Sequence, residues 1–563
     1  MKATLVRAGS IVFWVLTAAL ASPAIAADAG RPVTITVDAS RSEGPLPPVW
    51  RFFGADEPNY ATMKDGRKLL VELGNLRRGE VYFRAHNLLN TGDGTPAFKW
   101  GSTNAYTETP DGKPVYDWTV VDRIIDTYLA RGIHPYLQIG FMPEVLSTAP
   151  AGVPYQHLWR PGFDYKLIAT GWSYPPASYE KWGELVYQWT LHNIGRYGRD
   201  EVAKWYFEVW NEPNSNFYWQ GTPQDFYKLH DVAIAAVRRA LPVARVGGPD
   251  VAGAGGAFMD GFLEHVSSGK NYVTGEIGTP TDFLAFHAKG RPAFVDGHVR
   301  MGISTHLKEV DNGFQKIAAV TALAAKPIVI GESDPEGCAA CPGPQNAYRN
   351  GTMYSSYTAA SFVRIWELAQ KRRVNLEGVL TWAFEFENQP WFAGYRQLST
   401  NGVNLPVLNV FRMFAKLGSE RIAAKSDAQI PLDQIVADGV RGETDVGVLA
   451  TRTPQGGVTV LVWNYHDDDV PGPAAAVRLT IKGRKPKDTG AATLWRVDES
   501  HGNAFAAWKA LGSPQSPNAA QYEQLEKSSA LEAQTLQTQT VRRGTVQLDL
   551  SIPRQGVALV VLD

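Results

Sequence analysis

Eight apolar runs of strand length recur along much of the chain, and segments with helical periodicity separate them. The runs are continuously apolar, whereas a strand with one solvated face would alternate apolar and polar residues. Continuous runs are expected of parallel strands that helices cover on both faces. The runs extend over residues 49–55, 81–88, 135–141, 205–210, 245–249, 283–287, 327–331 and 379–386.

The segments between these runs carry helix signals. After Thr119 the apolar residues recur at helical spacing, and Thr119 and Asp122 have the spacing of a capping box. A cap, a first-turn proline and an acid open a second helix at residues 222–225, and a third covers 179–197. Strand–helix alternation of this kind predicts a (β/α)8 barrel over residues 27–418. A doubly wound open sheet is the alternative, but its glycine-rich turn after the first strand is missing.

From about Ile422 the pattern changes to short strands between clusters of Gly, Pro and Asp. These strands predict a β-sandwich domain over residues 419–563. Residues 504–533 are rich in Ala, Gln, Ser and Pro, which indicates a long surface insertion with some helix. A chain of 563 residues is also longer than one core usually holds, so we expect two domains.

Charge and composition narrow the class of ligand. The formal net charge is -1 and charged residues make up 20% of the chain, so no basic field points to nucleic acid. Aromatic residues make up 11%, with 17 tryptophans, which suits stacking on sugar rings as well as core packing.

The first 26 residues have the features of a secretory signal peptide. Lys2 and Arg7 form a basic start, an apolar stretch follows, and Ala24-Ile25-Ala26 supplies a small-x-small cleavage pattern. A membrane anchor is the alternative, but the apolar stretch is too short to span a bilayer, and no later stretch is long enough. We therefore expect a periplasmic or secreted protein without a membrane span.

Cys338 and Cys341 are the two cysteines of the chain. A zinc site would need further ligands, and a redox motif would need a thioredoxin-like context, neither of which the sequence offers. In an oxidising compartment a local disulfide is the favoured interpretation. We predict neither a metal nor a cofactor.

Polar residues gather at the ends of the apolar runs. The reactive groups of such a barrel lie at the C-terminal ends of its strands, where all of these residues would meet. Carboxylates can hold sugar hydroxyl groups, and an aromatic side chain can hold the face of a sugar ring. The residues at the run ends include His86, Asn211, Glu212, His287, Lys289, Glu332, Asp334, Trp382 and Glu387.

Cleavage of a glycosidic bond needs two carboxyl groups with different duties, one that protonates the leaving oxygen and one that stays ionised. Glu212 and Glu332 follow the fourth and seventh runs and fit this pair. A separation of about 5 Å would give retention through a covalent glycosyl-enzyme. Asp334 and Glu336 are rivals of Glu332 for the ionised group.

Several motifs stand out along the chain: Tyr116-Asp117-Trp118, Gly140–Glu144, Trp210–Asn214, Arg245–Pro249, Asp282–His287 and Ile328–Asp334. Together they resemble glycoside hydrolase family 39, the family of β-xylosidases and α-L-iduronidases. The resemblance covers nearly the whole mature chain and implies a retaining exo-acting glycosidase with a trailing sandwich, which residues 30–40 can join. It implies Glu212 as general acid/base, Glu332 as nucleophile, and His86, Asn211, His287 and Trp382 around the terminal sugar.

Lys289 departs from the β-xylosidase pattern, in which an aromatic residue is common at this position. It is similar to the iduronidase branch, where a lysine receives the uronate carboxylate. Lys289 could instead neutralise Glu387 or Asp334. The leading hypothesis is therefore a β-xylosidase acting on an oligosaccharide or glycoside. The alternatives are a uronide hydrolase and a secreted carbohydrate-binding protein without catalysis. The oligomeric state stays open, with a homo-oligomer among the alternatives.

Overall fold

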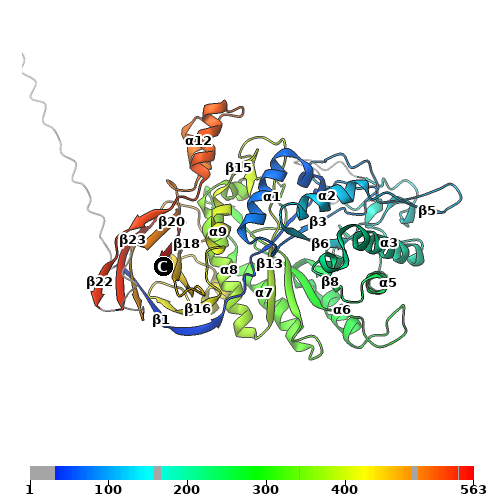
Figure 1. Ribbon diagram of the computed structural model, residues 1–563, viewed down its shortest axis with the longest axis horizontal. Coiled ribbons are helices and arrows are strands. Elements are labelled where there is room, and N and C mark those ends of the chain that lie inside the picture. Colours follow the sequence, from blue (N-terminus) through cyan, green and yellow to red (C-terminus); the bar gives the residue numbers. More distant parts are fainter. Residues whose placement is uncertain (1–31, 157–166, 342, 484–491, 543, 563) are drawn as a thin grey trace, which may run out of the picture.

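The computed structural model describes residues 32–156, 167–341, 343–483, 492–542 and 544–562. The predicted signal peptide lies outside the described residues. Within them, a barrel and a large β-sheet lie side by side, and helices fill the space between them (Figure 1). No helix in the described ranges is long and apolar enough to cross a membrane.

The barrel is closed and all of its strand pairs are parallel. Every predicted apolar run overlaps one barrel strand, so the predicted (β/α)8 barrel is confirmed. The last strand, β13, pairs with both β12 and β2 and thereby closes the ring. In chain order the strands are β2 (Phe52–Ala55), β3 (Val81–Ala85), β6 (Ile133–Ile139), β7 (Tyr206–Val209), β8 (Arg245–Val251), β9 (Phe283–Lys289), β12 (Pro327–Asp334) and β13 (Asn375–Thr381).

Helices follow the strands and form the outer layer. They are α1 (Lys64–Leu76), α2 (Thr119–Leu129), α3 (Tyr179–Tyr197), α4 (Arg199–Val202), α5 (Pro223–Ala240), α6 (Gly256–Ser268), α7 (Ile303–Ala319), α8 (Thr352–Arg372) and α9 (Pro406–Phe414). Short strands and 3-10 turns lie in the connections: β4 (Tyr106–Glu108), β5 (Pro114–Tyr116), β10 (Ala293–Val295), β11 (His298–Arg300), β14 (Ser399–Thr400), β15 (Val403–Asn404), η1 (Pro58–Thr62), η2 (Glu144–Leu146), η4 (Gly171–Ser173), η5 (Ala252–Gly255) and η6 (Pro344–Asn350).

The two predicted helix starts have different outcomes. At α5 the side chain of Thr222 accepts a hydrogen bond from the Asp225 N–H group, and the carboxylate of Asp225 accepts one from the Thr222 N–H group, which completes the predicted capping box. At α2 the predicted cap is wrong, because Thr119 is already helical. The carboxylate of Asp117 accepts the Thr119 N–H group at 3.0 Å and takes over the local capping role.

The second domain is built on a single ten-stranded sheet with the order β21-β20-β24-β18-β17-β16-β1-β19-β23-β22. The sheet curves around an apolar core of its own to which its strands contribute alternate residues (Figure 1). The β-domain predicted after the barrel as a sandwich is thus confirmed, and it is built on one curved mixed sheet with three short helices among its described residues. Its elements are β16 (Glu420–Ser426), α10 (Leu432–Asp438), β17 (Asp445–Arg452), β18 (Val458–Tyr465), β19 (Ala475–Lys482), β20 (Ala492–Val497), α11 (Ala504–Ala510), α12 (Ala519–Ser529), β21 (Gln534–Leu536), β22 (Gln539–Arg542), β23 (Thr545–Ile552) and β24 (Val557–Leu562).

The chain enters the second domain before it enters the barrel. Strand β1 (Val33–Pro45) lies in the ten-stranded sheet, antiparallel to β16 and parallel to β19. Helix α8 joins the two domains, because it packs against β13 of the barrel and β18 of the sheet. Nearly every residue of α8 is buried, as expected of a helix with no solvated face.

Candidate active site

The C-terminal ends of the barrel strands bring the two predicted carboxyl groups to one place. Glu212 follows β7, Glu332 lies near the end of β12, and His287 on β9 contacts both. The Nδ1 atom of His287 donates to Oε1 of Glu212 at 2.7 Å, and its Nε2 atom lies 3.9 Å from Oε1 of Glu332. One imidazole ring therefore separates the two carboxylates.

The backbone before the acid is held in an unusual conformation. Trp210 and Glu212 have positive φ angles of 72° and 44°, and Asp250 at the end of β8 has 53°. Non-glycine residues with such angles are strained and persist where the surrounding structure holds them. The Glu212 N–H group donates to the Asp250 carbonyl oxygen at 2.9 Å, which ties the two strand ends together. From this backbone position the Glu212 carboxylate contacts His287.

Glu332 lies between cationic side chains and the imidazole ring of His86. The Nζ atom of Lys289 donates to its Oε2 atom at 2.7 Å, and Nη1 of Arg84 and Nε2 of His86 each lie 3.7 Å from Oε1. Burial alone would raise the pKa of Glu332, but the charges of Lys289, His287 and Arg84 lower it well below its ordinary value of 4.5. Glu332 is therefore an ionised, buried carboxylate.

The two carboxylates differ in their access to solvent. The Glu332 side chain is 7% exposed, whereas the Glu212 side chain is 18% exposed. An acid/base must exchange protons with a leaving group and with water, whereas a nucleophile needs an ionised and shielded oxygen. The difference in exposure therefore matches the two duties that the sequence predicts.

Beneath these carboxylates lies a buried network that the sequence analysis missed. Arg84 donates to Glu208 at 2.6 Å, to Oδ1 of Asn211 at 3.1 Å and to Asp250. Asp250 also accepts a hydrogen bond from Nε2 of His287 at 2.8 Å. Although burial opposes a charge on His287, Asp250 and Glu332 raise the pKa of its imidazole to about 10. His287 is therefore a cation that donates from both ring nitrogens.

A sequence signal for Asp250 does exist. This residue directly follows the predicted fifth run, at the same relative position as the polar residues of the other strand ends. Its neighbour across the barrel is Gly331, where an added Cβ atom would lie 1.8 Å from the Asp250 carboxylate. Strand β12 therefore needs glycine at this position so that Asp250 can reach Arg84 and His287.

Aromatic side chains form one wall of the site. His86 lies with its ring centroid 4.3 Å from that of Trp382 and is stacked on Trp100 at 5.4 Å. Burial and the charge of Arg84 lower the pKa of His86, so this ring is neutral. The indole N–H group of Trp382 donates to Asp56 at 3.2 Å, and the close approach of its ring to β2 requires the absence of a side chain at Gly54.

Lys289 and Glu387 have separate environments. The ammonium group of Lys289 bridges Glu332 and Asp334, at 2.7 and 2.5 Å. The carboxylate of Glu387 accepts the N–H groups of Asp65 and Gly66 at 2.9 and 3.0 Å, at the first turn of α1. Glu387 therefore caps a helix and is not a partner of Lys289. Of the two acids that the sequence offered as partners of Lys289, Asp334 is the one that binds it.

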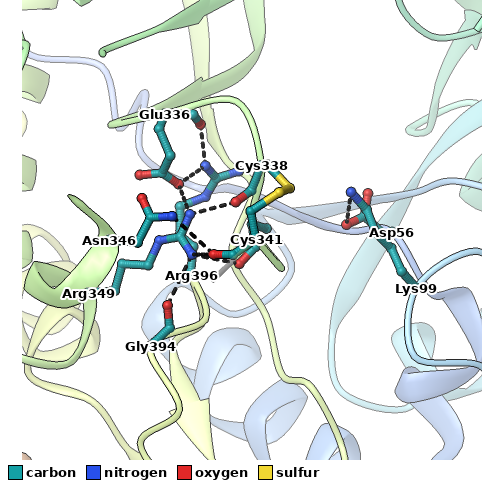
Figure 2. Close-up of a disulfide and its surroundings, with 10 residues drawn as sticks. Asp56, Lys99, Glu336, Cys338, Cys341, Asn346, Arg349, Gly394 and Arg396 are labelled. Carbon is teal, nitrogen blue, oxygen red and sulfur yellow. Dashed lines mark hydrogen bonds and ion pairs between the residues drawn. A yellow bond between two sulfur atoms is a disulfide. The ribbon is translucent and has the colours of Figure 1, made fainter. Parts of the chain in front are cut away.

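Cys338 and Cys341 form a disulfide in the loop that follows β12 (Figure 2). Across the described ranges, no group of three or more His, Cys, Asp or Glu side chains is arranged to hold a metal ion.

A closed (β/α)8 barrel with an ionised carboxylate and a second, more accessible one at its mouth has the two carboxyl groups that cleavage of a glycosidic bond requires. The chain matches the family model described as glycosyl hydrolases family 39 over residues 33–547. It belongs to this family, and the resemblance found in the sequence is confirmed.

Relatives of two activities match along most of the chain. A β-xylosidase of Caldicellulosiruptor saccharolyticus is 26% identical over 539 residues, which cover 94% of this chain and 98% of the relative. The human α-L-iduronidase is 27% identical over 558 residues, which cover 91% of this chain and 75% of the relative. A crystal structure of a monomeric β-xylosidase from Caulobacter crescentus has a TM-score of 0.70 at 22% identity, with 94% and 99% of the two chains covered. That likeness shows a shared fold.

Proposed function

We propose that this glycosidase is a retaining, exo-acting enzyme of the β-xylosidase type. The observation that carries the proposal is the position of Glu332, ionised among cations and one imidazole away from the more exposed Glu212. The β-xylosidase relative, which aligns over nearly its full length, supports the choice of sugar.

In the first step Glu332 attacks the anomeric carbon while Glu212 gives its proton to the departing oxygen, and a glycosyl ester forms on Glu332. In the second step Glu212 takes a proton from water, and the hydroxide displaces Glu332 from the anomeric carbon. His287 donates to Glu212 throughout, because Asp250 keeps its ring oriented and charged.

Asn211 is proposed to hold the 2-hydroxyl group of the terminal sugar. Its Oδ1 atom accepts from Arg84 at 3.1 Å and lies 3.0 Å from Nε2 of His86, so its amide NH2 group points away from those partners. A hydrogen bond to the 2-hydroxyl group strengthens as the transition state forms. Trp382, which lies against His86, would contact the sugar ring.

Two substitutions test the assignment. Glu332→Ala should abolish hydrolysis of an aryl β-xyloside. Glu212→Gln should slow glycosides with poor leaving groups by orders of magnitude and harm an activated aryl xyloside less, since nitrophenolate departs without a proton. Substantial activity of Glu332→Ala would overturn the nucleophile assignment, and equal losses on both substrates in Glu212→Gln would overturn the acid assignment.

A uronide hydrolase is the second candidate, and Lys289 supports it. A cation 2.7 Å from the nucleophile could also receive the carboxylate of an acidic sugar. Against this candidate, Glu332 and Asp334 already neutralise the ammonium group. A comparison of aryl β-xyloside with aryl α-L-iduronide decides between the two. A preference for the iduronide that survives in Lys289→Met would exclude Lys289 as the anchor.

We further propose that the protein acts in the periplasm or outside the cell. The disulfide suits an oxidising compartment, and residues 1–26 have the pattern of a signal peptide. Fractionation of the source cells, followed by N-terminal sequencing of the mature protein, tests this proposal. A protein that keeps Met1 and stays in the cytoplasm would overturn it.

A further inference from the structure

The loop closed by the disulfide surrounds a buried arginine. Arg349, on η6, is fully buried, and its guanidinium donates to the carbonyl oxygens of Cys338 at 2.5 Å, Ala339 at 3.2 Å and Cys341 at 3.0 Å. It also donates to the carbonyl oxygen of Gly394 at 3.0 Å, in the loop that follows β13 (Figure 2). Arg349 thus joins the loops that follow β12 and β13.

The same guanidinium is the outer end of a chain of alternating charges. Arg349 donates to Glu336 at 2.8 Å, and Glu336 also accepts a hydrogen bond from Arg396 (Figure 2). Arg396 lies 3.4 Å from Asp334, which in turn contacts Lys289 at 2.5 Å. Lys289 contacts Glu332 at 2.7 Å. Each group is buried or nearly so, which leaves these charges little screened by water.

Arg396 is the branch point of this chain. It donates to the backbone and side-chain oxygens of Glu336, and to the Trp382 carbonyl oxygen at 3.0 Å. The backbone N–H group of Trp382 donates to the Asp334 carboxylate, also at 3.0 Å. Any change in how tightly Glu336 holds Arg396 therefore reaches both Asp334 and the aromatic wall.

We propose that Arg349 and Glu336 are positioning residues for the nucleophile, and that the disulfide keeps the acceptors of Arg349 in place. Arg349 shares Glu336 with Arg396, so Arg396 is left free to hold Asp334. Asp334 then shares Lys289 with Glu332. The inference deepens the proposed function and rests on it, because it takes Glu332 as the nucleophile.

The signs of two charge-changing substitutions follow from this chain. Arg349→Gln leaves Glu336 to bind Arg396 alone, so Asp334 loses part of its cation and draws Lys289 away from Glu332. The nucleophile is then easier to protonate, and the acid limb of kcat/KM moves to higher pH by about half a unit or more. Glu336→Gln frees Arg396 for Asp334 and Lys289 for Glu332, so the limb stays at the wild-type pH or moves lower.

Titratable groups outside this chain also face Glu332 and keep their partners in both variants. They are Arg84 on β3, the neutral ring of His86 after β3, Asp56 after β2, Asp250 on β8, and His287 on β9, which also contacts Glu212. An upward shift of the acid limb in Arg349→Gln, with no upward shift in Glu336→Gln, therefore isolates the chain that starts at Arg349.

The experiment measures kcat/KM against pH with whichever nitrophenyl glycoside the wild-type protein hydrolyses. Arg364→Gln is the matched control, because Arg364 is also a buried arginine, paired with Asp445 at the domain junction. It should lower stability without moving the limb. Equal upward shifts in Arg349→Gln and Glu336→Gln would mean general loosening and overturn the proposal, as would no shift in Arg349→Gln.

Two further variants cover a failure of Arg349→Gln to fold. Arg349→Lys keeps the charge but loses the forked donor group, and Cys338→Ser/Cys341→Ser keeps every charge but opens the loop. Both variants should move the acid limb of kcat/KM to higher pH, by less than Arg349→Gln does. An unchanged acid limb in both variants would overturn the proposal. If the wild-type protein hydrolyses neither a xyloside nor an iduronide, the proposed function fails, whereas normal hydrolysis with unshifted variants removes the inference alone.

Discussion

At the scale of single residues, buried charges organise the site. Arg84, Asp250 and His287 form a network in which each ion has an opposite charge as a hydrogen-bonding partner. Removal of one member leaves the others uncompensated, which typically costs about 3–5 kcal/mol for a buried pair. The network therefore supports both the fold of the barrel mouth and the charge on His287.

Asp250→Asn should show how Asp250 controls both the charge and the orientation of His287. The amide keeps the shape but loses the charge that holds His287 protonated, so we expect the pKa of His287 to fall from about 10 toward its ordinary value. Loss of orientation should reduce kcat by about a hundredfold. NMR titration of the His287 ring measures the first effect and steady-state kinetics the second. Unchanged titration would contradict the role given to Asp250.

The ionised state of Glu332 predicts an acidic limit of activity. Its folded pKa lies below 4.5, so the carboxylate stabilises the fold above that pH, and this contribution is lost as the pH falls through the folded value. For an activated aryl glycoside the acid limb of kcat/KM should have its midpoint below pH 4.5. A midpoint above that value, in protein shown by circular dichroism to stay folded, would contradict the environment described for Glu332.

At the scale of elements, much could be predicted from the sequence. The barrel strands are continuous apolar runs because both of their faces are covered, and the cap of α5 depends on Thr222 and Asp225 alone. The predicted start of α2 is wrong because the carboxylate of Asp117 accepts the Thr119 N–H group, which the predicted capping box assigns to Asp122. A helix cap is therefore predictable where one nearby side chain can accept the N–H group, and less so where two side chains compete for it.

Features that depend on distant partners were not predictable. Arg84 and Asp250 are 166 residues apart in the chain, and each by itself is one polar residue at a strand end. Helix α8 is buried between two domains and so lacks the apolar stripe by which a surface helix is found. Glu387 follows a barrel strand, as the site residues do. Its carboxylate is occupied by two backbone N–H groups in the first turn of α1, a contact that the sequence does not reveal.

Glu387→Ala tests that last assignment. As a helix cap, Glu387 should contribute about 1 kcal/mol to stability, with little effect on KM. Thr222→Ala is the matched control, because it removes the cap of α5 and should show the same pattern. Chemical denaturation and steady-state kinetics measure the two quantities. A large rise in KM with unchanged stability in Glu387→Ala alone would restore its predicted role in substrate binding.

At the scale of the whole molecule, the two domains share a core. The main apolar cluster includes barrel residues together with Leu449, Trp463 and Leu559 of the second domain. The hairpin β10–β11 adds an ion pair across the junction, since Arg300 contacts Asp468 at 2.5 Å. The second domain is thus continuous with the barrel in both packing and charge.

A shared core predicts cooperative unfolding. Calorimetry should give one transition for the whole chain, and the fluorescence of the tryptophans should change at the same temperature as the far-ultraviolet circular dichroism. Arg300→Ala should lower the midpoint without splitting the transition. Two separate transitions in the wild-type protein would contradict the shared core.

The proposal that Glu332 is the nucleophile is tested most directly by trapping the covalent intermediate. An activated 2-deoxy-2-fluoro-xyloside should inactivate the enzyme, because the fluorine slows hydrolysis of the glycosyl ester more than its formation. Mass spectrometry of a proteolytic digest should then find one fluoroxylosyl group, on Glu332, with none in Glu332→Ala. A label on Asp334 or Glu336, or hydrolysis of the xyloside with no label on any carboxylate, would contradict the assignment of Glu332 as nucleophile.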